Sequence, residues 1–153
     1  MTEFQAEPRG EGRRFCLVVS RFNPMVTERL EAGARQALLR HGVRAEDIDV
    51  IRVPGAWELP QAARMAARMG YDGIVALGCV IRGETPHFDY VCRGATDGLA
   101  ALARQNPIPI GFGLLTTENL PQALDRSGGT VGNKGEEAAL AALELSALAD
   151  QLP

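Results

Sequence analysis

The sequence is nearly devoid of lysine: of its 16 basic residues all but Lys134 are arginine. A coding bias toward arginine explains most of this pattern, but not why one position kept an ammonium group. Acidic residues number 19, so the net charge is −3. This balance offers no basic field and argues against nucleic acid as a partner.

Cysteine and histidine are scarce. Cys16, Cys79 and Cys92 show no CxxC spacing, and they are interpreted as reduced packing residues of an intracellular protein. His41 and His87 lie far apart without a metal-ligand pattern. No metal site is therefore expected.

Long apolar runs are also missing. The longest, Gly73–Ile81, is far too short to span a membrane. The polar segment 1–13 lacks the apolar core of a signal peptide. We therefore expect a cytoplasmic protein with no membrane partner, in which the segment 1–13 precedes a single domain, 14–153.

Short apolar runs alternate with helical patterns along the whole chain. Strands are predicted at Phe15–Val19, Ile48–Val53, Ile74–Val80 and Ile108–Leu115. Helices are predicted from Pro24 (capped by Asn23) to His41, at Glu58–Met69, from Thr85-Pro86 to about Gln105, at Glu118–Arg126 (capped by Thr116 or Thr117) and at Lys134–Ala149, with a glycine-rich loop at Ser127–Asn133. Strands joined by helical crossovers form parallel sheets. The predicted fold is thus α/β, a flavodoxin-like three-layer sandwich with a parallel four-stranded sheet and helices on both faces.

Ligands of such folds bind beyond the carboxyl ends of the strands. Phe22, Trp57 and Glu58 follow the first two predicted strands. The two aromatic residues could stack on a flat heterocycle or pack on a first helical turn. Free backbone N–H groups at Ala56–Glu58 could donate to a polyol, whereas Glu58 could simply complement a helix dipole.

The third predicted strand leads into Gly83-Glu84-Thr85-Pro86, where glycine and a helix N-terminus favour an anion. The charge of Glu84 opposes that reading unless its side chain points away. His87, in the first turn of the next helix, is either a general acid–base or a plain surface histidine.

Arg126 and Lys134 flank the glycine-rich loop and could clamp a phosphate, although Arg126 could equally complement a helix C-terminus. The segment 132–135 lacks the residue order of a P-loop. Phe112 lies in the middle of a predicted strand, and Arg126 lies beyond a further helix. If both serve a ligand, they could serve the site of a neighbouring subunit.

From Phe15 almost to the C-terminus, the chain resembles the lumazine synthase family. The matching blocks are Ser-Arg-Phe-Asn (20–23), Pro-Gly-Ala-Trp-Glu-Leu-Pro (54–60), Gly-Cys-Val-Ile-Arg-Gly-Glu-Thr-Pro-His-Phe-Asp-Tyr-Val (78–91), Phe-Gly-Leu-Leu-Thr-Thr (112–117) and Gly-Asn-Lys-Gly (132–135). Their order and spacing match together, which makes the resemblance specific.

The resemblance implies a transferase of riboflavin biosynthesis. It would condense 5-amino-6-(D-ribitylamino)uracil with 3,4-dihydroxy-2-butanone 4-phosphate to give 6,7-dimethyl-8-ribityllumazine, phosphate and water, without a cofactor. It also implies a homo-oligomer with active sites between adjacent subunits: a pentamer, in some members a decamer or a 60-subunit icosahedral capsid. The two other hypotheses are a flavin- or lumazine-binding protein and a shell subunit with little activity.

The resemblance also assigns roles to individual residues. His87 would transfer protons, and Phe22 would stack on the pyrimidine. The other implied contacts are Ala56, Trp57 and Glu58 for the ribityl chain, Cys79, Val80 and Ile81 for the ring, Glu84 and Thr85 for the sugar phosphate, Phe112 and Arg126 as residues lent by the adjacent subunit, and Lys134 beside that site.

Overall fold

The computed structural model describes residues 1–153. Four parallel strands form its main sheet in the order β2-β1-β3-β4. Their bounds are β1 (Phe15–Ser20), β2 (Ile48–Val53), β3 (Gly73–Ile81) and β4 (Ile110–Thr117). The predicted four-stranded parallel sheet is confirmed, although β4 begins and ends two residues later than expected.

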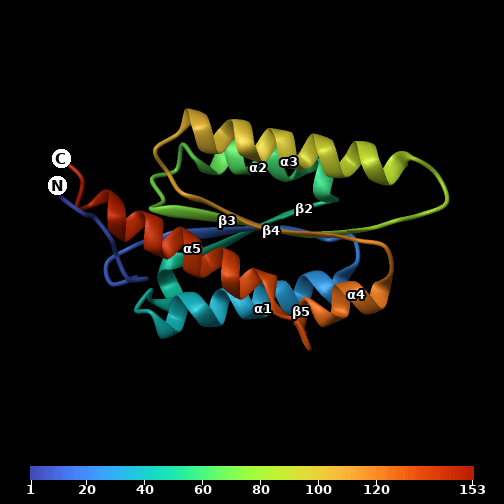
Figure 1. The fold of residues 1–153 in the computed structure, drawn as a ribbon, viewed down its shortest axis with the longest axis horizontal. Helices are drawn as coiled ribbons and strands as arrows, with labels where there is room; N and C mark the ends of the chain where they lie inside the picture. Colours follow the sequence, from blue (N-terminus) through green and yellow to red (C-terminus); the bar gives the residue numbers. More distant parts are fainter.

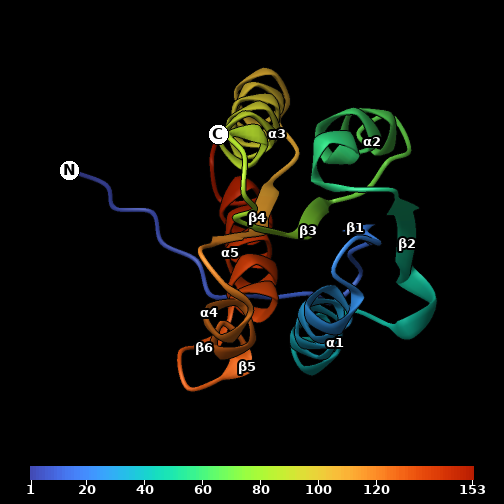
Figure 2. The same cartoon turned by 90° about the vertical axis from the view of Figure 1, so that its right-hand side faces the viewer.

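Helices cover both faces of the sheet, which confirms the three-layer arrangement. Figures 1 and 2 show α2 and α3 on one face, and α1, α4 and α5 on the other. The bounds are α1 (Pro24–Arg40), α2 (Leu59–Ala66), α3 (His87–Gln105), α4 (Leu120–Asp125) and α5 (Lys134–Ala149), with the 3-10 turns η1 (Ala45–Asp47) and η2 (Ala56–Glu58).

The central strands are buried on both faces, because each face is covered by helices. Along β1, Phe15 and Leu17 pack in the apolar cluster that includes α1 and α5. Cys16 and Val18 pack in the cluster that includes α2 and α3. Successive side chains of a strand point to opposite faces, and this explains why these strands read as uninterrupted apolar runs in the sequence.

Asn23 departs from its predicted role as a side-chain cap. Its backbone is left-handed, with φ 62°, and its side chain makes no capping hydrogen bond to α1. The amide Nδ2 instead donates to the carbonyl oxygen of Cys79 at 2.9 Å. Asn23 thus ties the turn after β1 to the end of β3, and the helix start relies on Pro24.

The region around α4 needs two corrections. Neither Thr116 nor Thr117 caps α4; the side-chain oxygen of Asn119 accepts the Gln122 N–H at 2.9 Å. The predicted loop Ser127–Asn133 is a small antiparallel hairpin, β5 (Ser127–Gly129) and β6 (Gly132–Asn133). The hairpin needs glycine, since Gly128 and Gly132 have φ values of 110° and 86°.

The chain termini lie at the opposite end of the molecule from the loop that joins β3 to α3 (Figure 1). The first residues extend away from the body (Figure 2), and their exit is fixed by Arg13, whose guanidinium donates to Asp150 at 2.7 Å. No helix combines the length and the apolar character that crossing a membrane requires.

Candidate functional site

One cavity of about 850 Å³ opens where β1, β2 and β3 end and α3 begins. This is the position that parallel α/β sheets favour for ligands. Its wall is formed by Phe22, Pro54, Gly55, Ala56, Trp57, Glu58, Cys79, Val80, Ile81, Gly83, Thr85, His87, Phe88, Tyr90 and Val91. The wall is mostly apolar with a few polar groups, as in small-molecule sites generally.

Most of the residues predicted for the site border this single cavity. They are Phe22, Ala56, Trp57, Glu58, Cys79, Val80, Ile81, Thr85 and His87. The wall does not include Glu84, Phe112, Arg126 or Lys134. The structure therefore brings one group together within a single subunit and leaves the other outside.

The exposed aromatic side chains of the cavity wall include those of Phe22 and Trp57. Phe22 is 70% exposed and Trp57 is 61% exposed. A residue that packs on a first helical turn would be covered, so the exposure of Phe22 argues against the staple interpretation. Both rings present faces on which a flat heterocycle can stack.

The indole ring of Trp57 packs against α3 at Gly94. A Cβ atom added to Gly94 would collide with Cζ3 of the indole and lie 2.8 Å from its Cε3. The absence of a side chain at Gly94 thus determines how far the indole stands from the cavity. Gly98, one turn further on, plays the same part for Pro60, whose Cβ would lie 2.7 Å from an added Cβ.

We expect Gly94→Ala to displace the indole and to raise the KM for the pyrimidine that the resemblance implies about three- to tenfold, because part of an overpacking cost of about 1–3 kcal/mol is then borne by the cavity. Steady-state kinetics and the fluorescence of Trp57, the only tryptophan, measure this effect. Gly98→Ala is the matched control, since it crowds Pro60 but no cavity residue. A similar KM change in both variants would contradict the specific role of Gly94.

Glu58 and Cys79 are two polar residues of the cavity wall. Glu58 accepts the Gly55 N–H at 2.9 Å through Oε1, so part of its carboxylate stabilises the turn that begins η2. Burial raises the pKa of the Cys79 thiol to about 12. That thiol stays protonated at neutral pH and cannot act as a nucleophile.

His87 is the first residue of α3 and borders the cavity. Its backbone N–H lies 3.4 Å from Thr85 Oγ1, while its exposed imidazole bonds to no other side chain. The ring is thus free to contact a bound molecule. Glu84, in the preceding loop, is exposed and does not line the cavity.

Arg126 and Lys134 lie side by side across the base of the hairpin. The backbone N–H of Lys134 donates to the Arg126 carbonyl oxygen at 2.8 Å. The Arg126 guanidinium donates to the Gln122 carbonyl oxygen at 3.0 Å, which is the helix-terminus contact considered above. Phe112 is 45% exposed on β4, at the edge of the sheet. None of the three borders the cavity.

Six further wall residues were not among the predicted site residues: Pro54, Gly55, Gly83, Phe88, Tyr90 and Val91. Phe88, Tyr90 and Val91 line the cavity from the first turns of α3. Tyr90 and Val91 follow His87 by three and four residues, the spacing that places side chains on one helix face. That spacing was the signal available, but it does not tell which face is turned toward the sheet.

Comparison with known proteins identifies relatives over nearly the whole chain. Residues 12–150 match the model of the family described as 6,7-dimethyl-8-ribityllumazine synthase. A 6,7-dimethyl-8-ribityllumazine synthase of Gemmatimonas aurantiaca is 54% identical over 99% of this chain and 93% of its own. Those of Salinibacter ruber and Chlorobaculum tepidum are 51% and 52% identical, over 93% and 92% of this chain and 92% of each relative.

Proposed function

The chain belongs to the 6,7-dimethyl-8-ribityllumazine synthase family, and we propose that the cavity at the ends of β1, β2 and β3 is its active site. It is a transferase that condenses 5-amino-6-(D-ribitylamino)uracil with 3,4-dihydroxy-2-butanone 4-phosphate. The products are 6,7-dimethyl-8-ribityllumazine, phosphate and water. One observation carries the site assignment: residues from four separate segments of the chain border the same cavity.

In the proposed complex the pyrimidine stacks on Phe22, and its edge meets the backbone of Cys79–Ile81. The ribityl chain lies along η2, where Ala56 and Trp57 border the cavity and Glu58 keeps one carboxylate oxygen for a hydroxyl. The sugar phosphate lies at the loop before α3, near Thr85. A helix N-terminus with free N–H groups stabilises a phosphate.

The chemistry needs proton transfers more than a nucleophile from the protein. The substrate amine attacks the ketone and forms an imine with loss of water, phosphate leaves by elimination, and the second amine closes the ring on the remaining carbonyl group with loss of a second water. His87 moves the protons in these steps. Holding two reactants in one cavity supplies much of the remaining acceleration.

Phe112, Arg126 and Lys134, the other residues that the resemblance assigns to the site, lie outside the cavity wall and suggest a site shared between subunits. We propose a homo-oligomer, a pentamer or an assembly of pentamers up to a 60-subunit capsid, in which each site receives Phe112 and Arg126 from the adjacent subunit, with Lys134 close by. The exposure of Phe112 and its absence from the cavity wall support this. We further propose a cytoplasmic location, in agreement with three free thiols.

The direct test of the function is turnover. The purified protein, incubated with both substrates, should release the lumazine, followed by its absorbance, and an equal amount of free phosphate. Binding of the pyrimidine or the lumazine without turnover would instead favour the binding-protein hypothesis.

Arg126→Ala is expected to raise the KM for the sugar phosphate about 10- to 150-fold, because a charged hydrogen bond is worth about 1.5–3 kcal/mol. The KM for the pyrimidine should stay within about twofold, since the guanidinium meets only the phosphate. Arg104→Ala, which removes an exposed arginine from the last turn of α3, serves as the control. An unchanged KM for the sugar phosphate would exclude Arg126 from phosphate binding.

A further inference from the structure

Arg82 begins the loop between β3 and α3 and contacts the residues that follow that loop. Its Nη2 lies 3.4 Å from Asp89 Oδ1, and its guanidinium carbon lies 4.5 Å from the centre of the Phe88 ring. The contacts of Arg82 thus join the two ends of the loop formed by residues 83–86. This loop carries Thr85 and leads directly to His87.

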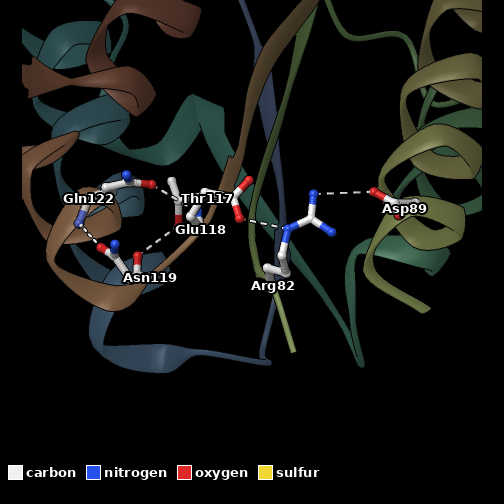
Figure 3. A network of polar contacts seen from close by, with 6 residues as sticks. All are labelled: Arg82, Asp89, Thr117, Glu118, Asn119 and Gln122. Atoms are coloured by element: carbon white, nitrogen blue, oxygen red, sulfur yellow. Dashed lines mark hydrogen bonds and ion pairs between the residues drawn. The ribbon is translucent and has the colours of Figure 1, made fainter. Parts of the chain in front are cut away.

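The position of Arg82 is in turn fixed by Glu118, a residue 36 positions away (Figure 3). Arg82 Nε donates to Glu118 Oε2 at 2.6 Å, and the Arg82 backbone N–H donates to the Thr117 carbonyl oxygen at 2.9 Å. A strong charged hydrogen bond to Glu118 also raises the pKa of Arg82 above its ordinary value. Arg82 is therefore held through both its backbone and its side chain.

Glu118 is held in a turn with its own network. Its N–H donates to Gln122 Oε1 at 2.8 Å, and the Gln122 N–H donates to Asn119 Oδ1 at 2.9 Å. Thr117 Oγ1 donates to the Asn119 carbonyl oxygen at 3.0 Å. The carboxylate that receives Arg82 is consequently carried by an ordered support rather than by a free surface chain.

We propose that Glu118 and Arg82 are positioning residues that hold the loop 83–86 in the shape that receives the sugar phosphate. The inference rests on the proposed function of this loop. Neither residue borders the cavity, whereas Phe88, on which the guanidinium lies, does. Their effect must therefore pass through Phe88 and through the ends of the loop.

Glu118→Ala is expected to raise the KM for the sugar phosphate about fivefold, in keeping with the upper range for exposed ion pairs. The KM for the pyrimidine should remain within experimental error, and the melting temperature should change by no more than in the control. That control is Asp47→Ala, which removes an equivalent arginine Nε partner (Arg44 Nε to Asp47 Oδ2, 2.8 Å) from η1, far from the cavity. Glu118→Gln, which keeps an acceptor oxygen, should restore part of the loss.

A double-substitution cycle separates positioning from direct contact. If Arg82 acts only in partnership with Glu118, the double variant Glu118→Ala/Arg82→Ala should be no worse than the poorer single variant. If Arg82 itself met the phosphate, freeing it by Glu118→Ala would leave the KM unchanged or lower it. That result, or equal rises in both KM values, would overturn the inference. Failure of the proposed function would appear earlier, as absence of turnover in the wild-type protein.

Discussion

Replacing His87 by alanine is expected to lower kcat about 100- to 10,000-fold, the usual contribution of a positioned general acid–base. The pyrimidine should still bind with little change in affinity, because its proposed contacts come from Phe22 and from the backbone of β3. The measurement is single-turnover kinetics for the chemical step, together with a titration of pyrimidine binding.

The chain provides a matched control, because it has only one other histidine. His41 caps the end of α1, and its Nδ1 lies 2.8 Å from the Ala37 carbonyl oxygen. His41→Ala should leave kcat unchanged, and any loss should appear in stability. If His87→Ala retained full turnover, the protons of the reaction would have to be moved by another group, and His87 would be removed from the mechanism.

The layers of the fold could be predicted because burial leaves a direct pattern. Val18, Ile74 and Val75 are fully buried in strands that are covered on both faces, and such strands produce short unbroken apolar runs. The helices between them show a different period, and parallel pairing then requires the carboxyl ends to share one edge. This reasoning predicts from the sequence that Phe22, Trp57 and His87 lie at one edge of the sheet, and all three border the cavity there.

Other features could not be predicted, because they depend on contacts between distant segments. Asn23 looks like an ordinary cap, yet its amide donates to Cys79, 56 residues away. Arg82 also bonds to a residue distant in the sequence, since its partner Glu118 lies beyond α3 and β4. The packing of Trp57 on Gly94 depends on how closely η2 approaches α3. The sequence near each of these residues does not indicate such long-range contacts.

Subunit mixing tests the shared site through a gain of activity rather than a loss. Oligomers that contain equal numbers of His87→Ala and Arg126→Ala subunits should recover about a quarter of wild-type activity, if one subunit gives His87 and its ring neighbour gives Arg126. In random mixtures about one site in four then receives both native residues. Each variant alone should be nearly inactive at low sugar-phosphate concentration, so this gain is easily measured after co-expression.

A second mixture makes the result specific to the interface. His87 and Trp57 border the same cavity within one subunit, so subunits with His87→Ala and Trp57→Ala cannot combine into a native site. Their mixture should show only the average of the two separate activities. If the first mixture also showed no more than its average, Arg126 would not be contributed across an interface. The cavity of a single subunit, with Thr85 and the N-terminus of α3, would then have to bind the phosphate without it.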